Sequence, residues 1–91
     1  MAADFREQVI AALSSVGPGQ VVSYGDLAEQ AGFPGAARGV GAVLASSRPE
    51  DGLCWWRVVY SSGKLAPGKE VEQSRRLQKE GVDVRDGRVV G

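Results

Sequence analysis

The stretch SYGDLAEQAGFPGAARGVGAVLASS, residues 23–47, decides the fold that we predict from the sequence. Ser23 is a good N-cap for a helix over 24–30, because its hydroxyl can accept a hydrogen bond from a backbone N–H of the first turn. The glycines and the proline of residues 31–35 end that helix, and the small residues over 36–47 predict a second one. Two short helices joined by a glycine-containing turn indicate a helix-turn-helix.

The sequence on either side of this stretch predicts further helices. Apolar side chains recur at helical spacing over residues 4–16, where Asp4 can cap the first turn. Residues 70–80 predict a charged helix with Val71 and Leu77 as its buried anchors. The domain that we expect is therefore mainly α-helical.

Short strands are predicted between and after these helices. The apolar run LCWWRVVY, residues 53–60, is typical of a buried strand, and Lys64-Leu65 can form a short strand after the next turn. The alternation on both sides of Asp86-Gly87 predicts a β hairpin, since this dipeptide suits a tight hairpin turn. We therefore predict a winged helix-turn-helix-like single domain over residues 1–91, mainly α with short β hairpins.

The composition argues against several classes of site and of protein. Cys54 is the only cysteine and there is no histidine, so we expect neither an internal disulfide, nor a metal site, nor a cofactor. The 11 basic and 11 acidic residues leave no net charge, so binding to nucleic acid would need a local basic patch and a specific pocket. No apolar run approaches the roughly 18 residues of a membrane span, and no signal peptide is visible. We expect a cytoplasmic monomer.

Four segments, read in order, carry a resemblance to a known family. They are VSYGDLA at 22–28, PGAARGVG at 34–41, CWWRVV at 54–59 and GKL at 63–65. Together they resemble the DNA-binding domain of the O6-alkylguanine-DNA alkyltransferases. Those enzymes carry a Tyr-Gly-x-Leu-Ala helix, an Ala-Arg-x-Val recognition helix and a Pro-Cys-His-Arg-Val active-site run. The resemblance extends from about Phe5 to Gly81.

The sequence departs from these enzymes in the active-site run. When it is aligned on Arg57-Val58, Trp55 stands at the position of the reactive cysteine, Trp56 at that of the histidine and Cys54 at that of the proline. Alkyl transfer needs an activated thiolate, whereas an indole N–H can only donate a hydrogen bond. The sequence therefore resembles the alkyltransferase-like branch of the family, in which tryptophan commonly replaces the nucleophile.

The resemblance implies a mechanism and assigns residues to it. The lesion is expected to leave the duplex through the minor groove, Arg38 to occupy the vacated space, and Tyr24 to push on the target's backbone phosphate. Trp55 and Val58 are expected to line the lesion pocket together with Tyr24. The other residues expected to contact DNA are Ala36, Ala37, Gly39, Gly41, Arg48, Arg57, Lys64 and Lys69. For Arg57 a purely structural role is left open.

Four residues around the expected pocket need an interpretation of their own. Cys54 is interpreted as a small buried thiol that faces away from the pocket, because neighbouring side chains of a strand point to opposite faces. Trp56 is expected in the core. Glu80 matches the glutamate that pairs with the enzymes' histidine, but we interpret it as a solvated residue at a helix end. Ser47 stands where the enzymes have an asparagine that braces the active-site turn, and a serine can make fewer of those hydrogen bonds.

The function that we predict is non-catalytic recognition of O6-alkylguanine in double-stranded DNA, after which nucleotide excision repair proteins take over the lesion. Three alternatives stay open. One is a self-alkylating transferase that uses Cys54 as its nucleophile. Another is a winged-helix regulator that recognises undamaged DNA, and the last is a degenerate family member without a role on DNA.

Overall fold

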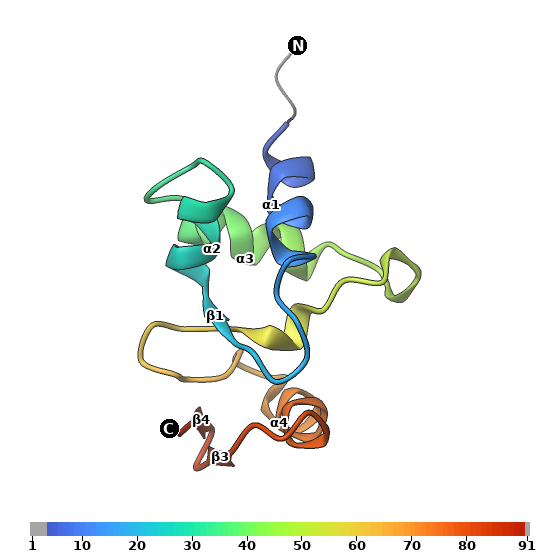
Figure 1. Cartoon of the computed structure of the whole chain (residues 1–91), viewed down its shortest axis with the longest axis vertical. Coiled ribbons are helices and arrows are strands. Elements are labelled where there is room, and N and C mark those ends of the chain that lie inside the picture. Colours follow the sequence, from blue (N-terminus) through green and yellow to red (C-terminus); the bar gives the residue numbers. More distant parts are fainter. Residues whose placement is uncertain (1–3, 91) are drawn as a thin grey trace.

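The computed structural model describes residues 4–90, which form helices joined by short strands (Figure 1). The elements in chain order are α1 Phe5–Leu13, β1 Val22–Ser23, α2 Tyr24–Gln30, α3 Ala37–Ala45, the 3-10 turns η1 Pro49–Asp51 and η2 Trp55–Arg57, β2 Val58–Val59, α4 Glu70–Lys79, β3 Val84–Arg85 and β4 Arg88–Val89. The predicted fold class is confirmed. None of the helices over residues 4–90 has the length and the apolar character that a membrane crossing requires.

Local capping decides where two of the helices begin. The Asp4 carboxylate accepts a hydrogen bond from the Glu7 backbone N–H at 2.8 Å, and the Ser23 hydroxyl oxygen accepts one from the Asp26 N–H at 3.0 Å. Each side chain satisfies a backbone donor that the first turn of a helix leaves without a partner. Both predicted N-caps are therefore confirmed, although α1 ends at Leu13, about one turn earlier than predicted.

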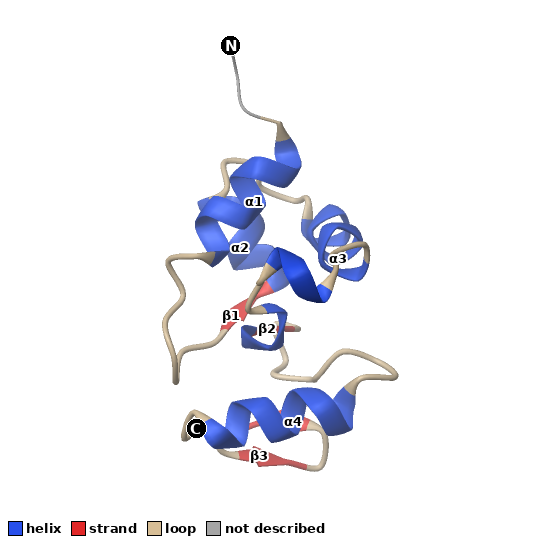
Figure 2. Cartoon of the chain, turned by 90° about the vertical axis from the view of Figure 1, so that its right-hand side faces the viewer, coloured by secondary structure: helices blue, strands red, loops and turns tan. Residues whose placement is uncertain are grey.

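The larger of two hydrophobic clusters lies between α1, α2, α3 and a short pair of parallel strands (Figure 2). β1 lies parallel to β2 with Val22 opposite Val58, so the chain after η2 returns to the part of the molecule that α1, α2 and α3 form. The residues of this cluster that are at most 1% exposed are Val9, Leu13, Leu27, Ala28, Val40 and Val58. Full burial of a side chain as large as valine or leucine contributes about 1.5–3 kcal/mol, so this cluster fixes α3 against α1 and α2.

The second cluster packs α4 against the C-terminal hairpin, and Figure 2 shows both below α1, α2 and α3. Leu65 and Leu77 are at its centre, each at most 1% exposed. β3 and β4 are antiparallel, and the two residues between them, Asp86 and Gly87, both have positive φ angles. Such angles are the signature of a type I′ turn. The hairpin predicted at this dipeptide is confirmed.

The prediction of one buried strand over residues 53–60 is wrong. The chain makes a 3-10 turn over Trp55–Arg57, and only Val58–Val59 pair with β1. A run of apolar residues shows that a segment is buried, but it does not show the backbone conformation in which the segment is buried.

The prediction that Val71 anchors α4 is also wrong. Val71 is 76% exposed, and the buried position near it belongs to Gln73, which is 0% exposed. The Gln73 amide nitrogen donates to the carbonyl oxygens of Val58 at 2.8 Å and Trp56 at 3.1 Å, and its oxygen accepts the Ala66 N–H at 2.8 Å. These three backbone groups lie in η2, in β2 and in the chain before α4, and they need a polar partner, which valine cannot supply.

Candidate nucleic-acid interface

A cavity of about 760 Å³ opens between α3 and the C-terminal part of the chain. The lining residues come from α2, α3, the chain between α3 and η2 that contains η1, η2 itself, the chain between β2 and α4, and α4. The lining residues are Tyr24, Ala37, Arg38, Gly41, Leu44, Ala45, Ser47, Arg48, Pro49, Gly52, Leu53, Trp55, Trp56, Tyr60, Ala66, Pro67, Lys69 and Arg76. Cavities of about 300–1,000 Å³ hold small organic ligands, so this cavity is large enough for a substituted nucleobase.

Four aromatic side chains contribute to the apolar surface of this cavity. The rings of Trp55 and Trp56 meet edge to face, with centroids 6.3 Å apart and planes at 88°. The rings of Tyr24 and Tyr60 lie 5.0 Å apart and are tilted by 51°. Partial burial, together with the neighbouring Tyr60, raises the pKa of Tyr24 above its ordinary value, so Tyr24 presents a neutral hydroxyl. Flat rings of this kind offer stacking surfaces for nucleobases.

The charged side chains that line the cavity are all basic, although Arg76 is paired with the Glu72 carboxylate at 3.0 Å. Arg38, Arg48, Lys69 and Arg76 line it, and none of the described lining residues carries a carboxylate. The Lys69 ammonium lies 5.3 Å from the centre of the Trp55 ring, and the Arg76 guanidinium lies 4.8 Å from the Trp56 ring. A chain without net charge thus concentrates positive charge at one opening, which is the electrostatic pattern expected of a phosphate-binding surface.

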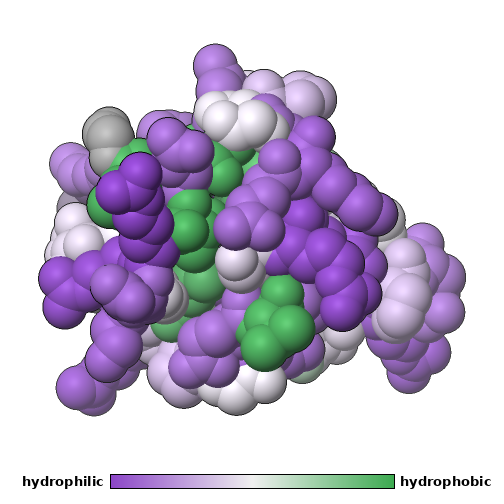
Figure 3. Space-filling model, turned by 90° about the horizontal axis from the view of Figure 1, so that it is seen from below, coloured by the Kyte–Doolittle hydropathy of each residue, from purple (hydrophilic) through white to green (hydrophobic). Residues whose placement is uncertain are grey.

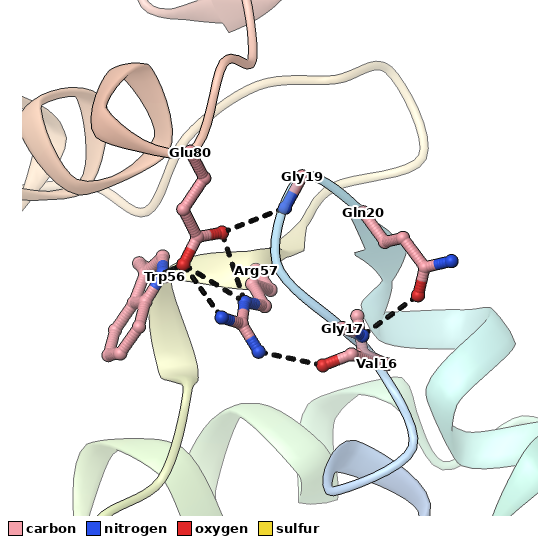
Figure 4. A network of polar contacts seen from close by, with 7 residues as sticks. All are labelled: Val16, Gly17, Gly19, Gln20, Trp56, Arg57 and Glu80. Atoms are coloured by element: carbon pink, nitrogen blue, oxygen red, sulfur yellow. Dashed lines mark hydrogen bonds and ion pairs between the residues drawn. The ribbon is translucent and has the colours of Figure 1, made fainter.

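A polar network behind the cavity fixes one of its aromatic walls (Figure 4). The Glu80 carboxylate accepts hydrogen bonds from Arg57 Nε at 3.0 Å, from Arg57 Nη2 at 2.7 Å and from the Trp56 indole N–H at 2.9 Å. The Gly19 backbone N–H donates to the same carboxylate at 3.2 Å, and Arg57 Nη1 donates to the Val16 carbonyl at 2.7 Å. The interpretation of Glu80 as a solvated residue is therefore wrong.

This network changes the acidity of its carboxyl group. The hydrogen bonds from Arg57, aided by those from Trp56 and Gly19, lower the pKa of Glu80 to about 2, although burial acts in the opposite direction. The hydrogen bond to Glu80 likewise raises the pKa of Arg57. Both groups are therefore charged across the physiological pH range, and the pair is a fixed structural element.

Most of the residues that the sequence assigns to the site lie at the cavity. They are Tyr24, Ala37, Arg38, Gly41, Ser47, Arg48, Trp55 and Lys69. Arg38 is exposed on α3, and Trp55 is half-buried in η2. The Ser47 hydroxyl donates to the Leu44 carbonyl at 2.7 Å, so it closes the end of its own helix. The roles of these residues toward DNA stay predictions.

Two assigned residues belong to the interior. Val58 is 0% exposed in the larger cluster and is not among the residues that line this cavity, so its methyl groups pack in the interior and a role of its backbone in the pocket stays a prediction. Its backbone pairing with β1 places the side chain among the helices. Arg57 is 8% exposed and bonded through all of its guanidinium nitrogens, so it takes the structural role that the sequence left open rather than a DNA-facing one.

Three further assigned residues lie outside the cavity lining. Ala36 packs against the larger cluster, and Lys64 forms a β-bridge with Arg88 at the hairpin. A Cβ added to Gly39 would come within 3.0 Å of the Phe5 ring, so this glycine allows α1 and α3 to approach each other. Close packing between the two helices thus requires a small residue at position 39, independently of any contact with DNA. Their contacts with DNA remain predictions.

Among the lining residues that sequence reasoning did not assign to the site, three have side chains suited to contact a nucleic acid. Trp56 was expected in the core, yet it is half-buried and lines the cavity. Tyr60 is 43% exposed and Arg76 lies one turn before the end of α4. Tyr60 directly precedes a predicted turn, and a large aromatic residue at that place could have indicated a partly exposed side chain. Nothing in the local sequence indicated that α4 would face α3 across the cavity.

Cys54 lies directly before η2 and is half-buried. The argument that it points away from Trp55 relied on the alternation of side chains in a strand, and that argument is wrong because the chain turns at this point. Cys54 is still not among the residues that line the cavity.

The lower end of the molecule has a different character. Figure 3 shows an apolar strip there, surrounded by hydrophilic side chains. A smaller cavity of about 430 Å³ lies between α4 and the hairpin, and Glu70, Arg75 and Asp86 are among its lining residues. Charges of both signs meet at this opening, so it lacks the uniform positive charge of the larger one.

Comparison with known proteins assigns these features to a family. Residues 4–82 match the model described as the 6-O-methylguanine DNA methyltransferase, DNA-binding domain. The DNA base-flipping protein of Vibrio parahaemolyticus is 37% identical over 88% of this chain and 82% of its own length. Alkyltransferase-like protein 1 of Schizosaccharomyces pombe is 33% identical over 89% of this chain and 79% of its own length. A crystal structure of S. pombe Atl1 in complex with damaged DNA containing O6-carboxymethylguanine superposes with a TM-score of 0.84 at 33% identity, covering 93% of this chain and 83% of that one.

Proposed function

The chain belongs to the family of 6-O-methylguanine DNA methyltransferase DNA-binding domains, and we propose that it recognises alkylated guanine in double-stranded DNA without repairing it. The observation that carries this proposal is the position of Trp55. Its indole lines the cavity together with Arg38, at the position that aligns with the reactive cysteine of the related enzymes. An indole offers a broad apolar surface to a base, but it is not a nucleophile.

In the proposed complex the damaged guanine is flipped into the cavity. Flipping costs a few kcal/mol of stacking and pairing energy, and it costs less for a damaged base. Arg38 extends from α3 into the vacated space, where its planar guanidinium can stack and form hydrogen bonds. Tyr24 contacts the backbone of the flipped nucleotide. The names of the V. parahaemolyticus base-flipping protein and of the S. pombe complex with damaged DNA support this assignment.

The charge around the cavity supports contact with the phosphates. Arg48 and Lys69 line its rim without a carboxylate among the described lining residues, and α3 presents Ala37 and Gly41 on the same side. Small residues allow a helix backbone to lie close to the minor groove, which carries little sequence information. A surface of this kind suits a protein that inspects many sequences for one type of damage.

The transfer reaction is absent from this proposal for a chemical reason. Moving an alkyl group from guanine O6 to sulfur requires a thiolate and a neighbouring group that takes the thiol proton. The sequence contains no histidine, and Trp56 with its donor-only N–H stands beside Glu80. Cys54 does not line the cavity.

Recognition alone leaves the lesion in the DNA, so a second activity has to remove it. We propose that the bound complex is taken over by nucleotide excision repair proteins. We further propose that the chain is located in the cytoplasm and that it acts as a monomer, because residues of a single chain line the larger cavity, which can receive one flipped base.

The proposal is tested by a titration in which matched duplexes with and without O6-methylguanine compete for the protein. We expect the lesion duplex to bind at least about tenfold more tightly, because the damaged base costs less to flip and fills the cavity. Equal affinities would refute damage recognition and would favour the winged-helix regulator. Failure of both duplexes to bind at low salt would favour a member of the family without a DNA role.

The same samples distinguish binding from repair. With a radiolabelled alkyl group on guanine O6, the label should stay on the DNA after prolonged incubation. Stoichiometric transfer of the label to the protein would refute the proposal and would identify a transferase. Cys54→Ser would then show whether this thiol is the acceptor.

The role of Arg38 is tested in the same titration with the variant Arg38→Ala. Arg85→Ala is a suitable control for it, because Arg85 is an exposed arginine of the hairpin that does not line the cavity.

A further inference from the structure

We propose that Glu80 is a positioning residue that holds the Trp56 indole as a rigid wall of the lesion cavity. The inference rests on the proposed function, because it concerns the cavity that would receive the flipped base. It assigns a binding role to two residues that sequence reasoning placed in solvent and in the core.

The Glu80 carboxylate is itself held firmly. Arg57 contacts it with two nitrogens, at 3.0 and 2.7 Å, and the Gly19 N–H donates to it at 3.2 Å. The Glu80 and Arg57 side chains are only 14% and 10% exposed. A paired guanidinium and carboxylate of this geometry leaves little freedom of rotation to either group. The oxygen that accepts the Trp56 N–H is therefore fixed in space.

The Trp56 ring is held at its edge and on its faces. Its N–H donates to Glu80 at 2.9 Å, and the guanidinium groups of Arg76 and Arg57 lie 4.8 and 5.5 Å from its centre. Its ring meets that of Trp55 edge to face. Contacts in these different directions restrict the indole to one rotamer. A pocket wall that is fixed before binding saves the entropy of ordering it afterwards, which favours tight and selective binding.

The network also joins the two hydrophobic clusters. Glu80 follows α4, whereas Val16 and Gly19 precede β1 in the helical part of the molecule (Figure 4). The cavity lies between these same two parts, with Arg38 on one side and Arg76 on the other. The hydrogen bonds that orient Trp56 therefore also connect the end of α4 and η2 to the chain between α1 and β1.

Replacing Trp56 by two smaller rings distinguishes this role from simple packing. Phenylalanine is more apolar than histidine but has no N–H, whereas histidine can still donate to Glu80. We expect Trp56→His to retain a preference for the O6-methylguanine duplex at least about tenfold greater than that of Trp56→Phe, the scale of one hydrogen bond to a charged group. An equal or greater preference in Trp56→Phe would overturn the inference, because apolar contact alone would then account for Trp56.

A second measurement needs no DNA and therefore separates this inference from the proposed function. The chain has two tryptophans, so its NMR spectrum contains two indole N–H signals that single variants can assign. In Glu80→Gln we expect the Trp56 indole N–H to exchange with solvent about fivefold faster, while Trp55 is unaffected, because a neutral acceptor binds it more weakly. Glu29→Gln, at an exposed carboxylate of α2, is the matched control and should change neither signal.

The two experiments have distinct outcomes. Unchanged exchange at Trp56 in Glu80→Gln would overturn the positioning role even if the protein binds lesions well. Faster exchange, in a protein that does not distinguish the two duplexes, would support the Trp56–Glu80 contact and refute the lesion-binding function instead.

Discussion

Protonation of Glu80 in acid should destabilise the fold by an amount that the structure defines. The pKa of this carboxyl group is about 2 in the folded protein, against an ordinary value of 4.5. The folded state thus binds the proton more weakly than the unfolded state, so the stabilisation is complete above about pH 4.5 and is lost as the pH falls to about 2. The shift corresponds to roughly 3 kcal/mol as an upper limit. Because the side chain is 14% exposed and water screens part of the interaction, we expect about 1–2 kcal/mol.

The assay is urea unfolding followed by tryptophan fluorescence, repeated at steps from pH 7 to pH 2 for the native sequence and for Glu80→Gln. The difference between their free energies of unfolding should be constant above about pH 5 and should shrink by about 1–2 kcal/mol by pH 2. Glu29→Gln should follow the native sequence over this range. A difference between native and Glu80→Gln that does not change with pH would refute the reasoning, since Glu80 would then titrate as it does in the unfolded chain.

Three further predictions concern the cavity. Arg38→Ala should weaken binding to the O6-methylguanine duplex by about 1–3 kcal/mol in the titration described above, and an unchanged affinity would remove Arg38 from the mechanism. A Cβ added to Gly41 meets no atom within 4 Å, so Gly41→Ala should raise the free energy of unfolding by up to about 1 kcal/mol, measured by thermal unfolding. The same variant should lower the affinity for the lesion duplex, because the added methyl group enters the cavity. A gain in both would show that this helix does not approach DNA. Tyr60→Ala should reduce lesion affinity by about 1–3 kcal/mol through lost stacking, and Tyr60→Phe should not, so equal losses would argue against a stacking role.

The parts of the fold that depend on neighbouring residues in the chain could be predicted. Asp4 and Ser23 act within three residues of their own positions, and the Asp86-Gly87 turn is determined by the φ angles of its two residues. The helix-turn-helix follows from two such local boundaries. These features need no knowledge of what the segments pack against, so a single sequence is sufficient for them.

The errors arise where distant segments meet. Glu80 looks solvated beside its own helix, and its partners Arg57 and Gly19 lie 23 and 61 residues away in the chain. Gln73 looks polar and therefore exposed, yet it is buried because the turns around η2 need hydrogen bonds. The resemblance to the alkyltransferases indicated which residues to examine, but only the packing showed that Val58 faces the interior.

The arrangement of charge around the cavity has a consequence for how the protein would search a genome. If Arg38, Arg48, Lys69 and Arg76 all engaged phosphates, they would displace about four counterions and would contribute a log–log slope of about −3.6 to the fall of duplex affinity with salt. A chain with no net charge adds no long-range attraction to this. Encounters with undamaged sites should therefore be brief at cellular ionic strength, and the dwell time at each site would be governed by whether a base can be drawn out and retained.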